Sequence, residues 1–211
     1  MQCKGFLFDL DGTLWDASIP IVQCWNDVFR RKGANKQLSL DDMHRLMGKT
    51  LPEIASALFP GWPDAARQNL IQECCEAELV PLKRQGGTLY PLVEETLRTL
   101  HRQYSLYIVS NCQDGYIPCF LEAHGLAPLF ADWECSGNTG KSKGENIRMV
   151  IERNRLDRAV YLGDTLGDQR AAEEAGIPFL HAAYGFGQPD KPVPSLKAFS
   201  DLPSLLSYIL R

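Results

Sequence analysis

The chain has 211 residues, 45% of them hydrophobic, and a formal net charge of −4, which suits one large domain or a core with a small accessory unit. The mildly acidic balance and the absence of long Lys/Arg runs argue against nucleic-acid binding. No apolar run approaches the length of a membrane span and no signal peptide precedes Asp9, so we expect a soluble, cytoplasmic protein that binds no membrane.

Near the start of the chain, residues Gly5–Phe8 form a short apolar and aromatic run that ends at a turn signal. It predicts a strand buried on both faces, as in a parallel sheet. Asp9 and Asp11 follow directly, where open α/β sheets bind ligands. Two unit charges about 4 Å apart repel by about 4 kcal/mol at an effective dielectric of 20, so the pair favours a hard cation such as Mg²⁺. Taken alone, Asp-x-Asp-Gly is also typical of ordinary turns.

Residues 16–87 carry almost only helical patterns. Helices are predicted at Ile19–Arg31, after a capping box of Ser39 and Asp42, from Pro52 to Leu58, and from Asp64 to Arg84. The block is longer than the dozen or so residues that a crossover needs. We therefore interpret 16–87 as an inserted helical cap and 1–15 with 88–211 as the core; a plain first crossover is the alternative. Within the cap, Lys49 is a candidate substrate contact or a solvated helix-end lysine.

From Tyr90 onward, strand and helix patterns alternate. Strands are predicted at Leu106–Val109, Leu129–Cys135, Ala159–Leu162 and Ile177–His181, and helices at Leu92–Gln103, Asp114–Ala123, Glu145–Asn154, Asp164 or Asp168 to Ala175, and Leu202–Leu210. We interpret Gln188–Pro194 as a surface loop. The alternation predicts an α/β fold with a doubly wound parallel sheet.

Polar side chains come just past the predicted strand ends. Asp9, Ser110 and Asp164 would share one edge of the sheet, with Asp168 at the start of the next helix. Helix capping explains an isolated aspartate there. Four carboxylates at one edge, Asp11 included, would be destabilising without a cation. The Ser110 hydroxyl suits a phosphate oxygen.

Two lysines, Lys141 and Lys143, lie in the loop before the predicted Glu145–Asn154 helix. A lysine beside carboxylates and a phosphate would offset negative charge and orient the attacking group. The alternative is a solvated loop lysine, and we expect at least one of the two to be that.

Four segments in order resemble the motifs of the haloacid dehalogenase-like (HAD) hydrolase superfamily. They are FLFDLDGTLW at 6–15, Val109–Asn111, Gly140–Ile147 and Gly163–Gly176. Each is weak alone, but the ordered set is specific and covers residues 5–176. The resemblance implies a Rossmann-like core, a small all-helical cap after the first motif, and Mg²⁺-dependent phosphoryl transfer from a small phosphorylated substrate.

The resemblance also implies roles by position. Asp9 resembles the nucleophile that forms an aspartyl-phosphate, and Asp11 the acid/base. The implied Mg²⁺ ligands are Asp9, Asp11 through its backbone carbonyl, Asp164 and Asp168; the implied phosphate contacts are Ser110, Leu10 and Asn111. The lysine motif departs from the commoner Lys-Pro-x-Pro form. We choose Lys143 as the catalytic lysine, and keep Lys141 as the alternative and as a substrate contact.

Three functions follow from the resemblance. Asp11 favours a phosphatase or a mutase, since dehalogenase relatives lack a carboxylate there. A phosphatase acting on a phosphoglycolate-, sugar-phosphate- or nucleotide-type ester is preferred. The alternatives are a sugar-phosphate mutase of the β-phosphoglucomutase type and a catalytically silent phosphate-binding protein. We expect a monomer or a homodimer.

Overall fold

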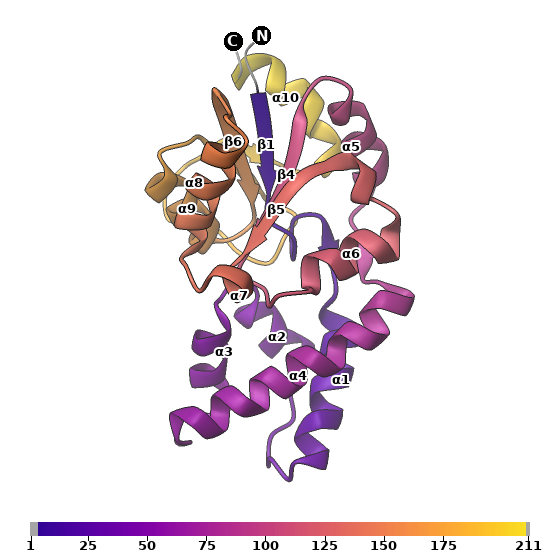
Figure 1. Ribbon diagram of the computed structural model, residues 1–211, viewed down its shortest axis with the longest axis vertical. Helices are drawn as coiled ribbons and strands as arrows, with labels where there is room; N and C mark the ends of the chain where they lie inside the picture. Colours follow the sequence, from indigo (N-terminus) through magenta and orange to yellow (C-terminus); the bar gives the residue numbers. More distant parts are fainter. Residues whose placement is uncertain (1–3, 210–211) are drawn as a thin grey trace.

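The computed structural model describes residues 4–209, and in this part of the chain six parallel strands form the central sheet (Figure 1). They are β1 (Lys4–Phe8), β4 (Ser105–Ser110), β5 (Phe130–Cys135), β6 (Arg158–Gly163), β7 (Phe179–Ala182) and β8 (Ser195–Leu196), in the spatial order β5-β4-β1-β6-β7-β8. Strand β1 pairs with β4 on one side and with β6 on the other. The predicted α/β class with a parallel sheet is confirmed.

Helices cover both faces of the sheet because β1 is apolar on both. Phe6 and Phe8 belong to one buried cluster and Leu7 to another, as the period of two along a strand requires. The Phe6 side is covered by α5 (Val93–His101) and α10 (Leu202–Ile209), and the Leu7 side by α8 (Lys143–Arg153) and α9 (Leu166–Ala175). The last residue of the predicted C-terminal helix, Leu210, lies outside the described residues.

Four helices of residues 18–85 form what we call the helical group, beyond the carboxyl edge of the sheet and far from both termini (Figure 1). They are α1 (Ser18–Arg31), α2 (Leu40–Leu46), α3 (Leu51–Leu58) and α4 (Asp64–Gln85). The chain enters the group through β2 (Trp15–Asp16) and leaves it through β3 (Thr88–Leu89). These two short strands pair antiparallel, with Asp16 opposite Thr88, so both crossings lie side by side.

Several helix starts differ from the predictions. The capping box of Ser39 and Asp42 is confirmed. Aspartates begin three other predicted helices and would cap them, but the N-cap residues are Pro63 for α4, Gly115 for α6 (Tyr116–His124) and Thr165 for α9. The Thr165 side chain accepts from the Asp168 amide, and the Asp168 carboxylate accepts from the Thr165 amide. Asp168 is therefore the third residue of a capping box and not the cap itself.

The short strands escaped prediction. Strand β8 pairs with β7 through His181 and Ala182, directly after the predicted loop. Strands of two residues carry no periodic pattern. No helix of the described chain is long and apolar enough to cross a membrane.

Candidate active site

The centre of the site is a buried lysine between two carboxylates. Lys143 Nζ donates to Asp9 Oδ1 at 2.9 Å and to Asp168 Oδ1 at 2.6 Å. Asp9 follows β1, Lys143 is the first residue of α8, and Asp168 lies in the first turn of α9. Burial opposes the charge of Lys143, but Asp168 and Asp9 outweigh it and raise the pKa of the ammonium. Lys143 is therefore charged and held in place.

The second predicted lysine lies apart from this cluster. Lys141 is exposed, two residues before α8, and its amide donates to the Thr139 hydroxyl at 3.1 Å. The difference arises because Ser142 caps α8, so that Lys143 falls on the buried side of the first turn.

Asp164, the carboxylate after β6, is enclosed by backbone. Its Oδ2 accepts from the Phe186 amide at 2.7 Å, and Thr13 Oγ1 lies 3.4 Å from its Oδ1. Gly12 has a φ of +84°, and a Cβ there would lie 2.3 Å from Asp164 Oδ2. Glycine at position 12 therefore lets the loop after β1 pass close to this carboxylate.

Three carboxylates converge as the sequence predicted. Oxygens of Asp9, Asp164 and Asp168 lie within 4.8 Å of one another, and all three side chains are buried. Burial and then Asp168 raise the pKa of Asp9 to about 6, against the lowering effect of Lys143. Burial, Asp168 and Asp9 raise the pKa of Asp164 well above its ordinary value. An all-oxygen donor set with more negative than positive charge fits a hard divalent cation such as Mg²⁺.

The two oxygens of Asp168 are both occupied by protein donors. Oδ1 accepts from Lys143, and Oδ2 accepts from the amide and the hydroxyl of Thr165 at 2.9 and 2.7 Å. Asp164 accepts from the Phe186 amide and has the Thr13 hydroxyl 3.4 Å from its other oxygen. Asp168 thus contributes to the negative charge and fixes the position of Lys143.

Asp11 lies in a different environment from Asp9. Its Oδ1 accepts from Trp15 Nε1 and from the Tyr116 hydroxyl, each at 2.9 Å. Burial, followed by the charge of Asp9, raises the pKa of Asp11 to about 7, while both hydrogen bonds lower it. The side chain is not part of the carboxylate trio. A carboxyl with this pKa can give and take a proton near neutral pH.

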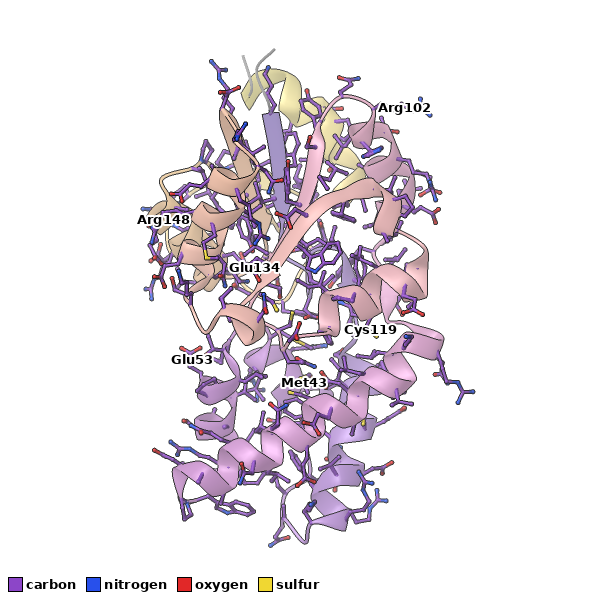
Figure 2. The ribbon with its side chains drawn as sticks, in the orientation of Figure 1. Met43, Glu53, Arg102, Cys119, Glu134 and Arg148 are labelled. Atoms are coloured by element: carbon purple, nitrogen blue, oxygen red, sulfur yellow. The ribbon has the colours of Figure 1, made fainter. Side chains whose placement is uncertain are left out.

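A small cavity of about 60 Å³ lies between the core and the helical group, next to Asp9 and Asp11. Asp9, Asp11 and Ser110 line its core side, and Lys49 is an exposed residue at its rim. In Figure 2, Met43 of α2, which also lines the cavity, marks the side of the helical group.

The remaining predicted phosphate contacts take two different positions. Leu10 is buried, and its backbone amide donates a hydrogen bond to the Asp9 carboxylate. Asn111 Nδ2 donates across the cavity to the carbonyl of Gly48 at 2.8 Å, and Ser136 Oγ donates to Asn111 Oδ1 at 2.9 Å. The Asn111 side chain therefore joins the core to the segment that carries Lys49.

Sequence reasoning missed one buried carboxyl in the cavity. Glu78 of α4 is 2% exposed, and its carboxylate accepts from Trp25 Nε1 and from Gln113 Nε2. A signal existed, because Ile71, Cys74, Glu78 and Leu82 recur at helical spacing and all are buried. An acidic residue on such a stripe is either satisfied within the fold or functional.

Comparison with known proteins shows the family of the chain. The family described as haloacid dehalogenase-like hydrolase matches residues 6–182. A phosphoglycolate phosphatase of Rhodobacter capsulatus is 30% identical, over 97% of this chain and 95% of the relative. One from Vibrio parahaemolyticus is 32% identical, over 88% and 87%. The crystal structure of a predicted phosphatase from Clostridium acetobutylicum has a TM-score of 0.80 at 20% identity, covering 100% of this chain and 99% of that one.

The fold and the site define an α/β enzyme with its carboxylates gathered at the carboxyl edge of a parallel sheet. The chain belongs to the haloacid dehalogenase-like hydrolase family, because the family match extends over most of it. The predicted enzyme class, an HAD-like phosphoric monoester hydrolase, is confirmed by this membership and by the relatives.

Proposed function

We propose that the protein is a Mg²⁺-dependent phosphatase that hydrolyses a small phosphorylated metabolite through an aspartyl-phosphate at Asp9. The observation that carries the proposal is the buried contact of Lys143 with Asp9, beside Asp164. The phosphoglycolate phosphatase relatives make 2-phosphoglycolate the first ester to test, with sugar phosphates and nucleotides after it.

Asp9 is the proposed nucleophile. An Asp9 carboxylate oxygen forms a bond to phosphorus while the bond from phosphorus to the leaving oxygen breaks. Lys143 holds the carboxylate in place and offsets its charge as the phosphate approaches. Ser110, at the end of β4 on the cavity wall, would donate to a phosphate oxygen.

Asp11 is the proposed acid and base. Protonated, it gives its proton to the leaving alkoxide; ionised, it then takes a proton from the water that attacks the aspartyl-phosphate. Proton transfer of this kind contributes about 10²–10⁴-fold. The pKa of about 7 supports both states near neutral pH, and Trp15 and Tyr116 keep the carboxyl oriented.

The Mg²⁺ ion would be held by Asp9, Asp164 and the backbone carbonyl of Asp11. When bound, it supplies positive charge that offsets the carboxylates and the phosphate. We propose that Asp168 acts beside it by holding Lys143, whose ammonium donates to Asp168 Oδ1.

We also propose that the helical group, residues 16–87 with its paired crossings, is the cap that closes over the substrate. It supplies one wall of the cavity, including Met43 and Glu78.

A metal-supplemented phosphatase screen tests the proposal. Phosphate release from a panel of small esters should require Mg²⁺, stop on addition of EDTA, and return when Mg²⁺ is restored in excess. Undiminished turnover in EDTA would contradict the metal dependence. Absence of phosphate release from every ester would contradict the function itself.

A further inference from the structure

Glu78 has no part in the chemistry proposed above, yet it lines the same cavity. It is buried on α4, in the wall that faces Asp9 and Ser110. A carboxyl in this position meets whatever part of the substrate extends away from the phosphate. Glu78 is therefore a candidate for substrate selection.

Both oxygens of Glu78 accept hydrogen bonds from neutral N–H donors. Gln113 Nε2 donates to Oε1 at 2.5 Å, and Trp25 Nε1 donates to Oε2. An indole nitrogen can only donate, so Oε2 is fixed as an acceptor. Trp25 belongs to α1 and Gln113 follows β4, so the helical group and the core hold this carboxyl together.

The described part of the chain supplies no cationic partner for an ionised Glu78. Among residues 4–209, no lysine, arginine or histidine is among the hydrogen-bond partners or charge neighbours of Glu78. Burial, with a smaller contribution from Asp11, raises the pKa of Glu78 to about 8, although the hydrogen bonds from Gln113 and Trp25 lower it. A buried carboxylate without a counter-charge is unfavourable. A ligand with a positive group would supply that counter-charge.

Apart from Glu78 and from Lys49 at the rim, the side chains of this wall are mostly apolar. They are those of Ile21, Trp25, Met43, Leu46, Met47, Leu51 and Ile54. A sugar with several hydroxyls would leave some of them without partners, which is costly in a buried site. A short chain with a single polar group fits better.

We propose that Glu78 determines specificity by binding a protonated amine on the alcohol part of the substrate, which is then the phosphate ester of a short amino alcohol. This rests on the phosphatase function proposed above and narrows its substrate class. Lys49, exposed at the cavity rim, is the residue that would favour an anionic alcohol part instead. The competing ester is therefore 2-phosphoglycolate.

The first experiment uses three esters that differ at the end remote from phosphate. They are O-phosphoethanolamine, which ends in an ammonium; propyl phosphate, which ends in a methyl group; and 2-phosphoglycolate, which ends in a carboxylate. Phosphate release by the wild-type enzyme with Mg²⁺ should give a kcat/KM for O-phosphoethanolamine at least about tenfold above that for propyl phosphate, as expected for a hydrogen bond to a charged group. The value for 2-phosphoglycolate should be lowest.

The second experiment uses the isosteric variant Glu78→Gln. An amide keeps the size and one acceptor but loses the charge, so the preference for O-phosphoethanolamine over propyl phosphate should fall to about threefold or less. Glu76→Gln is the matched control, because Glu76 is exposed on the same helix and should keep the wild-type ratio. Thermal unfolding of each variant checks that the fold is retained.

The outcomes distinguish the proposed role of Glu78 from the phosphatase function on which it rests. Hydrolysis of propyl phosphate with no preference for the amine, or with 2-phosphoglycolate preferred, overturns the role of Glu78 and leaves the phosphatase intact. This result from the wild-type enzyme is decisive even where Glu78→Gln fails to fold. No hydrolysis of any ester overturns both.

Discussion

Asp9 of the core and Glu78 of the helical group line one cavity, and these two buried carboxyls differ in what balances their charge. On the core side, Asp9 and Asp168 share the ammonium of Lys143. On the side of the helical group, the donors to Glu78 within residues 4–209 are the neutral N–H groups of Trp25 and Gln113. A permanent cation suits a site that must hold the same charge through every turnover. A buried carboxyl without a cationic side chain beside it suits a site in which the bound ligand supplies the positive charge.

Replacement of the proposed nucleophile should produce the largest effect and test the core side of this comparison. Asp9→Asn leaves an amide that cannot attack phosphorus, so turnover should fall by on the order of 10⁴-fold or more. The amide is nearly isosteric, and we expect the fold to be retained, which circular dichroism would check. Substantial Mg²⁺-dependent phosphate release from the purified variant would sink the assignment of Asp9.

Removal of the Lys143 ammonium should have the second largest effect. Comparison with a variant of Lys141 shows which of the two lysines is catalytic. Lys143→Ala leaves Asp9 and Asp168 without their partner, so activity should fall by about 10²–10³-fold. The free energy of unfolding without metal should fall by about 3–5 kcal/mol, as for other broken buried ion pairs. Lys141→Ala, at an exposed position, should change stability by less than about 0.5 kcal/mol.

Denaturant titrations and phosphate-release rates for the two variants side by side decide between the lysines. Equal activity losses would show that the buried contact of Lys143 with Asp9 has no special part in turnover. A larger loss in Lys141→Ala would reverse the choice.

The pH dependence of the free energy of unfolding tests whether Glu78 lacks a counter-charge in the folded protein. Glu78 titrates at about 8 in the folded protein, against an ordinary value of 4.5. Between these values the folded state holds a proton that the unfolded state has lost. The contribution of Glu78 to the free energy of unfolding should therefore be most favourable below pH 4.5 and fall until about pH 8, by a few kcal/mol at about 1.4 kcal/mol per pKa unit.

Glu78→Gln should remove this part of the pH dependence. Asp9 and Asp11 contribute with the same sign in both proteins, so the difference between wild type and variant between pH 5 and pH 8 reports Glu78. Denaturant unfolding at the two pH values measures it, and Glu76→Gln should follow the wild type. Parallel curves for wild type and Glu78→Gln would mean that the buried carboxyl is compensated within the protein.

The core side could be predicted from the sequence because its signals are local. Each of the strands β1, β4 and β6 is an apolar run that ends at a polar residue, and parallel pairing brings Asp9, Ser110 and Asp164 to one edge. The choice between Lys141 and Lys143 depends on where α8 begins, which spacing alone left open.

The cluster around Glu78 could not be predicted in the same way. Gln113 lies 35 residues from Glu78 in the chain, and no local pattern pairs them. Only the position of Glu78 on an apolar helix stripe is readable from the sequence. The contact itself depends on how the helical group packs on the core.

The contact between Asn111 and Gly48, which also joins the core to the helical group, is expected to give the smallest effect. Asn111 Nδ2 donates to the Gly48 carbonyl, next to Lys49, and Ser136 fixes the orientation of the amide. Asn111→Ala removes one neutral hydrogen bond, worth about 0.5–1.5 kcal/mol, and keeps the backbone amide. If this bond holds the rim over the substrate, KM should rise about three- to tenfold while kcat changes less than about twofold. Asn138→Ala, whose amide bonds Glu134 within the core, is the matched control and should leave both parameters unchanged. A loss confined to kcat would place Asn111 with the reacting groups of the core, and not at the joint between the two sides.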